Sequence, residues 1–382
     1  MTKPICGPQH ADGEVHPVAM PLKGRGAVSA MAHRFTRLAS ECFDDGWGTL
    51  DQCAAEETLP PSTQVIEEQA KSILSRNESP DIPFDRSVNP YRGCEHGCIY
   101  CFARPTHSYL GLSPGLDFET RIVAKVNAAE RLRAALAQPA YRPSPLNLGS
   151  ATDAYQPVER KLRITRAVVE VLSECRHPFT LVTKSSGVER DLDLIAPMGA
   201  ERLAMVHVSV TSLDHDLSRI LEPRAAAPRR RLQTIEALAR AGVPVGVSVS
   251  PVIPFINEPE IERILEAAAN AGASHAFTVV LRLPWEVSPL FQEWLQAHFP
   301  QRAARVMARV REMRGGRDYD ANFKSRMTGE GVWASLLQQR FRKAVSRLGL
   351  NQERMDLDVS QFRPPLAPAV APAADADQLP LF

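Results

Sequence analysis

Short apolar runs alternate with longer stretches of helical character along the chain from about residue 122 onward. The runs are rich in Val, Ile, Leu and Phe and predict strands, and the stretches between them predict helices. Strands are predicted at residues 122–126, 146–149, 179–183, 203–210, 243–252 and 276–281, and helices at residues 128–137, 162–175, 192–198, 229–241 and 259–271. Crossovers of about a dozen residues or more imply a parallel sheet, doubly wound or closed as a barrel, with helices on one or both faces. No G-x-G-x-x-G turn follows a strand, which argues against a dinucleotide-binding unit.

The two ends of the chain lack this alternation. The first stretch, about 60 residues with Pro, Gly and Asp-Asp-Gly clusters, predicts a mostly irregular leader that wraps the domain or stays mobile. Residues 63–73 predict a short helix, and residues 364–377 form a Pro/Ala linker that should stay extended. The predicted organisation is an irregular extension (1–75), an α/β domain (76–285), a helical basic region (286–358) and a disordered linker with a short apolar end (359–382).

Charge is unevenly distributed along the 382 residues, although the net charge is only +1. Residues 1–93 carry 9 Lys and Arg against 13 Asp and Glu, whereas residues 301–343 carry 11 against 4. The basic segment predicts an anionic partner such as nucleic acid, or else a solvated helix face rich in arginine. Both interpretations stay open on sequence alone.

The cysteines and the apolar content of the sequence predict in which cellular compartment the protein is found. Of the seven cysteines, four are scattered without pairing spacing and no secretory leader is present, which predicts a reducing cytosol. No run of about 18 apolar residues occurs, so no membrane span is expected. The sequence therefore predicts a soluble, cytoplasmic protein. The four scattered cysteines are Cys6, Cys42, Cys53 and Cys175.

The other three cysteines carry the clearest chemistry. Cys94, Cys98 and Cys101 form a C-x3-C-x2-C triplet, which can hold three corners of a cubane iron–sulfur cluster and leave the fourth iron open to a substrate. A structural zinc would need four ligands, and His96 or His107 could supply the fourth, so a zinc knuckle remains an alternative. If no zinc is bound there, His96 is expected to be a solvent-facing turn residue. The tyrosine directly before the third cysteine, Tyr100, suits an adenine packed beside the cluster.

On these residues the chain is identified as a member of the radical S-adenosylmethionine (SAM) enzymes, and the run 87–118 resembles the branch similar to spore photoproduct lyase, often labelled DNA repair photolyase-like. The resemblance implies an α/β fold, the partial (β/α)6 barrel open on one side. It also implies a [4Fe-4S] cluster, S-adenosylmethionine, and an electron donor such as flavodoxin or ferredoxin. In such enzymes the reduced cluster cleaves SAM to methionine and a 5′-deoxyadenosyl radical, which abstracts hydrogen from the substrate.

Further candidates follow the predicted strands, because chemistry in a parallel α/β sheet lies at the carboxyl ends of the strands. By the resemblance, Lys184 could pair the carboxylate of SAM, and Ser209 could reach its ribose or amino-acid end. Asp153 follows the strand that ends at Gly149 and is also expected to contact the cofactor. Neighbouring hydroxyls, such as that of Ser185, could equally be helix caps.

One departure from the family concerns the substrate. Spore photoproduct lyases return a hydrogen atom through a cysteine shortly after the second strand of the sheet, but residues 149–155 contain none. Tyr155 could replace it as the hydrogen donor, so Tyr155 is the candidate catalytic residue and spore photoproduct is not expected as the substrate. The favoured interpretation is a radical SAM enzyme of the lyase class that acts on nucleic acid. The alternatives are an iron–sulfur adaptor recruited to DNA, and a radical enzyme acting on a protein or small molecule.

The last five residues suggest a protein partner. They resemble the motif by which bacterial DNA polymerases and repair proteins dock on the sliding clamp. The docking would use a glutamine anchor followed by large apolar side chains, namely Gln378, Leu379, Leu381 and Phe382. Folding back onto the domain is the competing explanation for this apolar end.

Overall fold

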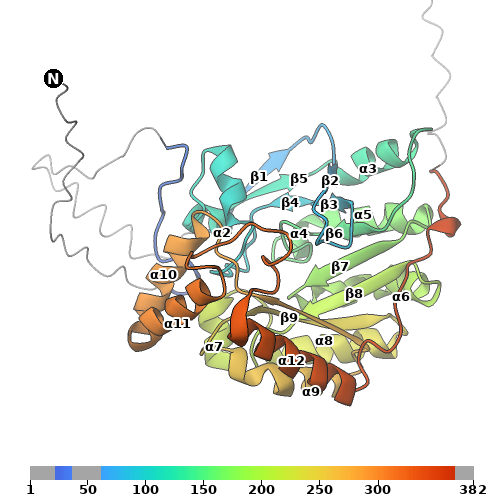
Figure 1. Cartoon of the computed structure of the whole chain (residues 1–382). Helices are drawn as coiled ribbons and strands as arrows, with labels where there is room; N and C mark the ends of the chain where they lie inside the picture. Colours follow the sequence, from blue (N-terminus) through green and yellow to red (C-terminus); the bar gives the residue numbers. More distant parts are fainter. Residues whose placement is uncertain (1–21, 37–61, 366–382) are drawn as a thin grey trace, which may run out of the picture.

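The computed structural model describes residues 22–36 and 62–365, and a seven-stranded sheet lies at its centre (Figure 1). The strands are β2 (Leu74–Arg76), β3 (Arg86–Val88), β6 (Leu146–Leu148), β7 (Phe179–Thr183), β8 (Ala204–Ser209), β9 (Val245–Val252) and β10 (His275–Val280). Their order is β10-β9-β8-β7-β6-β3-β2, and every pair from β10 to β3 is parallel, while β2 joins β3 antiparallel. Because β10 and β2 form separate edges, the sheet is an open, partial barrel, which confirms the predicted α/β fold class.

Helices cover the convex face of this sheet (Figure 1). They are α3 (Ala128–Leu136), α5 (Ile164–Glu174), α6 (Leu192–Ala200), α8 (Pro228–Arg240) and α9 (Ile261–Asn270). In α9 the buried residues are Ile261, Ile264, Leu265 and Ala268, which is the spacing of one apolar stripe on a helix. Each buried Ile or Leu contributes about 1.5–3 kcal/mol, so the stripe fixes the helix on the sheet.

The concave face carries the alternate strand residues, since successive side chains of a strand point to opposite faces. The rings of His207 on β8 and Phe277 on β10 lie 5.1 Å apart across β9. Gly246 of β9 lies between them, and a Cβ there would sit 2.5 Å from Cδ2 of His207. Only glycine therefore lets the two rings meet on this face.

A second, smaller sheet consists of β1 (Gln64–Glu68), β5 (Arg121–Lys125) and β4 (Tyr91–Arg92), in the order β1-β5-β4. The predicted helix at residues 63–73 is therefore wrong. All five residues of β1 pair in parallel with β5, and this long-range pairing overrides the local preference. The extension before the barrel thus includes a strand.

Three helices follow the barrel: α10 (Val287–His298), α11 (Pro300–Glu312) and α12 (Gly331–Arg347). Buried residues of α10, including Phe291 and Trp294, share one apolar cluster with Ile99 and Tyr100. The indole of Trp294 also donates to the carbonyl of Ile220 at 3.0 Å. These helices therefore support the loop that carries the cysteines, while α12 lies against α9 (Figure 1). Within the described ranges, no helix is long and apolar enough to span a bilayer.

Candidate active site

The three cysteines lie in the loop between β4 and the 3-10 helix η1 (Arg104–Leu110). Cys94 and Cys98 are buried and Cys101 is half-buried. Two turns of this loop need glycine: Gly93 and Gly97 have φ of 82° and 66°. A Cβ on Gly97 would also lie 2.7 Å from the Glu119 carboxylate. The loop is thus closely packed against α2 (Leu116–Thr120), which carries Glu119.

A buried ion pair fixes the backbone of this loop. Arg104 is fully buried, pairs with Glu119, and donates to the carbonyls of Gly97 at 3.1 Å and Cys98 at 2.9 Å. Glu119 in turn accepts the backbone N–H groups of Gly26 at 3.0 Å and Ala27 at 2.8 Å. The pair therefore joins the cysteine loop to the segment 22–36, through Gly26 and Ala27.

The three thiols form a donor set that fits an iron–sulfur cluster, whose irons are held by cysteine sulfurs. Burial, the Asp153 carboxylate and the neighbouring thiols raise the pKa of Cys94, and burial raises that of Cys98 to about 12. Thiolates here therefore need a cationic metal to stabilise them. A tetrahedral structural zinc would require a fourth ligand besides these three cysteines.

Each histidine of the zinc alternative has one ring nitrogen engaged elsewhere. His96 is 2% exposed, and its Nδ1 lies 3.2 Å from Asp153, so the expected solvent-facing position is wrong. The physical reason is this pairing with a buried carboxylate. His107 is fully buried, and its Nε2 lies 3.0 Å from the carbonyl of Arg121.

Tyr100 belongs to a buried polar network at the mouth of the barrel. Its hydroxyl donates to Glu222, which lies just after α7 (His215–Leu221) and is paired with the buried Arg231. The ammonium of Lys184 lies 5.9 Å from the centroid of the Tyr100 ring. Burial lowers the pKa of Lys184, but Cys98 and Glu222 outweigh this effect and raise it overall. Lys184 is therefore a firmly charged cation beside the cysteine loop.

Ser209 joins the same network from the end of β8. Its side chain is almost fully buried, and its carbonyl accepts from Arg231 at 3.2 Å. The structure thus brings the predicted residues Tyr100, Lys184 and Ser209 together around Glu222 and Arg231.

The carboxylate of Asp153 is held by hydrogen bonds from neighbouring parts of the site. Its oxygens accept from the Thr183 hydroxyl and from the N–H groups of Lys184 and Tyr155, each at 2.8 Å. Burial raises its pKa, but His96 and these hydrogen bonds outweigh burial and lower it to about 2. Asp153 therefore ties the ends of β6 and β7 to the cysteine loop, and its contact with a cofactor remains a prediction.

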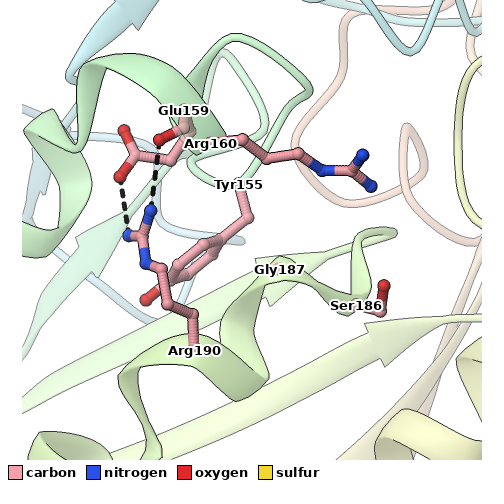
Figure 2. Close-up of a pocket in the computed structure, with 6 residues that line it drawn as sticks. All are labelled: Tyr155, Glu159, Arg160, Ser186, Gly187 and Arg190. Atoms are coloured by element: carbon pink, nitrogen blue, oxygen red, sulfur yellow. Dashed lines mark hydrogen bonds and ion pairs between the residues drawn. The ribbon is translucent and has the colours of Figure 1, made fainter.

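Tyr155 is turned toward the helical layer. Its hydroxyl donates to Asp191 at 2.9 Å, at the end of the 3-10 helix η2 (Ser186–Asp191). Figure 2 shows its ring beside Arg190 in a pocket of about 290 Å³ between η2 and α4 (Glu159–Leu162). The hydrogen-donor role remains a prediction, and it would require the bond to Asp191 to break.

Comparison with known proteins gives three findings. A family model of the radical SAM superfamily matches residues 88–268. An uncharacterized protein of Mycobacterium tuberculosis (strain H37Rv) is 36% identical over 234 residues, which is 61% of this chain and 68% of that protein. A protein of Pseudomonas phage M6, named radical SAM Nalpha-GlyT isomerase, is 26% identical over 222 residues, or 56% of this chain and 43% of that protein.

Solved structures agree on the fold. Spore photoproduct lyase complexed with dinucleoside spore photoproduct superposes with a TM-score of 0.52 and 15% identity, over 75% of this chain and 80% of that chain. At this identity the likeness establishes a shared fold.

Proposed function

Since the chain belongs to the radical SAM superfamily and is therefore an enzyme that uses a [4Fe-4S] cluster and SAM, we propose that it abstracts hydrogen from a nucleic acid substrate. When bound, the cluster and SAM supply one-electron cleavage of the sulfonium and an organic radical that can abstract hydrogen. Membership of this enzyme superfamily argues against the alternative of an iron–sulfur adaptor protein. One observation supports the radical chemistry: a loop with three cysteines, two of them buried, lies beside Lys184 at the carboxyl end of β7.

Specific residues would hold these groups. We assign Cys94, Cys98 and Cys101 to three irons of the cluster. Lys184 would pair the carboxylate of SAM, because it is the cation that lies over Tyr100. Tyr100 would supply a flat wall whose orientation is fixed by Glu222. Ser209 would offer a hydroxyl to the ribose or amino-acid end.

The choice of nucleic acid rests on the charge of the basic segment that follows the barrel. Part of the basic segment is used inside the protein, since Arg326 pairs with Asp81 and Arg340 with Glu258 and Glu262. The exposed cations that make no ion pair within the described ranges remain available to phosphates. They include Arg302, Arg305, Arg317 and Lys324. Spore photoproduct lyase, for its part, was solved with a dinucleoside ligand.

Deuterium transfer tests the substrate class. The reconstituted, reduced enzyme would be given SAM and uniformly deuterated oligonucleotides, and mass spectrometry would measure label in 5′-deoxyadenosine. Labelled 5′-deoxyadenosine is expected from nucleic acid and not from deuterated peptides or small metabolites. Label that arises only from peptides or metabolites would overturn the nucleic acid assignment and favour the remaining alternative.

A further inference from the structure

Five aromatic side chains from distant parts of the sequence are exposed, and two of them, Phe102 and Tyr109, lie in the cysteine loop or in the 3-10 helix that follows it. We call them the rim aromatics: Phe35 (50% exposed), Phe102 (50%), Tyr109 (67%), Trp285 (64%) and Phe323 (46%). The other large hydrophobic side chains that are exposed in the described ranges are all aliphatic. Exposed aromatic surface of this extent favours contact with a ligand.

Three of the rim aromatics surround one fixed arginine. The guanidinium of Arg34 lies 4.9 Å from the ring centroid of Phe35, 5.3 Å from that of Tyr109 and 4.4 Å from that of Trp285. Glu286 holds this guanidinium through an ion pair of 2.8 Å. The rings are thus arranged around a cation whose position is set.

Each of the other two rim aromatics also has an arginine guanidinium over its ring. Arg282, just after β10, lies 5.3 Å over Phe102, the residue that directly follows Cys101. Its Nε is buried and lacks a hydrogen-bond partner among the residues that the structure describes. Arg326 lies 4.6 Å over Phe323. Phe102 is thus the rim aromatic that lies between the cysteine loop and the end of β10.

This combination suits unpaired nucleobases. Every base presents a π-face that stacks on aromatic rings and on guanidinium planes, and arginine and lysine near such rings can contact phosphates. Arg317 and Lys324 lie exposed on the same loop as Phe323 and form no ion pair within the described ranges. A duplex keeps its bases stacked internally and must unpair a base before it can stack on these rings, whereas a single strand offers its bases directly.

We propose that the rim aromatics bind single-stranded nucleic acid and lead an unpaired base to the mouth of the barrel beside Cys101. This inference rests on the proposed function and names the form of its substrate. The surface would act in binding and orientation, and the hydrogen abstraction would stay with the site at the strand ends.

Fluorescence anisotropy with labelled single-stranded DNA and RNA and with the matching duplex tests this surface. The cluster-loaded full chain would be titrated without SAM or reductant, so the result does not depend on turnover. Tight binding of the single strand is expected, with a loss of about 5- to 100-fold in affinity for Trp285→Ala and for Phe102→Ala. The control is Val332→Ala on α12, an aliphatic side chain that is 74% exposed and has no ring for a base to stack on, and it should bind like the wild type.

Several results would overturn the proposal. These are no binding of single strands, equal binding of the duplex, or unchanged affinity in both aromatic variants. Self-association by sedimentation that Trp285→Ala abolishes would show instead that a second copy covers the rim. If single strands bind through the rim but no deuterium reaches 5′-deoxyadenosine, the chemistry proposed above fails while this surface stands. Melting temperatures of the variants would exclude misfolding as the cause.

Discussion

Arg104 and Glu119 are the charged residues on which the cysteine loop most depends. Both are fully buried, and together they fix two carbonyls of the loop and two N–H groups of the segment that covers it. The sequence contains no sign of this pair, because two charges 15 positions apart follow neither helical nor strand periodicity. In contrast, the spacing of Cys94, Cys98 and Cys101 is local, and it could be recognised without any structure.

Substituting Arg104→Leu should lower the free energy of unfolding by about 3–5 kcal/mol, because it leaves the Glu119 carboxylate buried and unpaired. Urea denaturation would measure this loss, and iron analysis should show less cluster per chain. The control is Arg133→Leu, whose pair with Glu174 is 42% and 44% exposed and should contribute less than about 1 kcal/mol. Equal effects of the two substitutions would contradict the role given to Arg104.

Lys184 offers a direct probe of cofactor binding. Lys184→Met should weaken SAM affinity about 10- to 100-fold, since a hydrogen bond to a charged group contributes about 1.5–3 kcal/mol. Equilibrium dialysis with radiolabelled SAM would measure the affinity, and the iron content should stay at the wild-type level. Lys161→Met, an exposed lysine on α4, is the control. Unchanged SAM affinity in Lys184→Met would remove Lys184 from the binding site.

The buried His177 predicts a dependence of stability on pH. Burial lowers its pKa from 6.5 to about 4. The folded state keeps the imidazole neutral, so the unfolded state binds more protons between pH 6.5 and 4, and the free energy of unfolding falls as pH drops through that window. Chemical denaturation at several pH values should show a loss of up to about 3 kcal/mol from this group. His177→Gln should flatten the slope, and an unchanged slope would refute the assignment.

At the scale of elements, sequence periodicity predicted most of the strands and helices of the barrel. The strand predicted at residues 179–183 is β7, and the helix predicted at residues 259–271 contains α9, because both bury a regular apolar face. β3 and β4 were missed because three and two residues are too short to show a period. β1 was mistaken for a helix because its partner β5 lies far along the chain. The alternative for Ser185 also proved apt, since its hydroxyl caps η2 by accepting the N–H of Gly187 at 3.0 Å.

The close packing of side chains over β8, β9 and β10 requires a glycine at position 246, and this requirement can be tested. Gly246→Ala should lower the free energy of unfolding by about 1–3 kcal/mol, because the new Cβ would collide with the His207 ring. The double variant Gly246→Ala with His207→Ala should recover part of this loss, as a thermal denaturation cycle would reveal. If the two substitutions were additive, the steric explanation would be incorrect.

At the scale of the whole molecule, the described residues form two large apolar cores, and the cysteine loop packs into the smaller of them. One lies between the sheet and its covering helices, and the other joins the loop to α10 and α11. The parallel alternation predicted the first core. The second could not be inferred, because nothing in the sequence of α10 specifies that its apolar stripe packs on residues near Tyr100. The proposed substrate form depends on the surface next to this second core, where Phe102 directly follows Cys101.

The final residues give a prediction for the whole chain. Gln378, Leu379, Leu381 and Phe382 lie outside the described residues, so docking on a bacterial sliding clamp remains a prediction from the sequence. Deleting residues 378–382 should abolish clamp binding in calorimetry and leave the melting temperature unchanged. Phe382→Ala should weaken it at least about tenfold, since a buried aromatic contributes about 1.5–3 kcal/mol. Clamp binding that survives the deletion would discard the motif.

The central claim is that this chain builds a competent radical SAM site from its cysteine loop. The most direct measurement is 5′-deoxyadenosine formation by the anaerobically reconstituted, dithionite-reduced enzyme with SAM, beside Cys98→Ala prepared in the same way. The account predicts product from the wild type and none from Cys98→Ala. Wild-type protein with a full complement of iron and sulfide that forms no product, and whose cluster EPR signal SAM leaves unchanged, would contradict it.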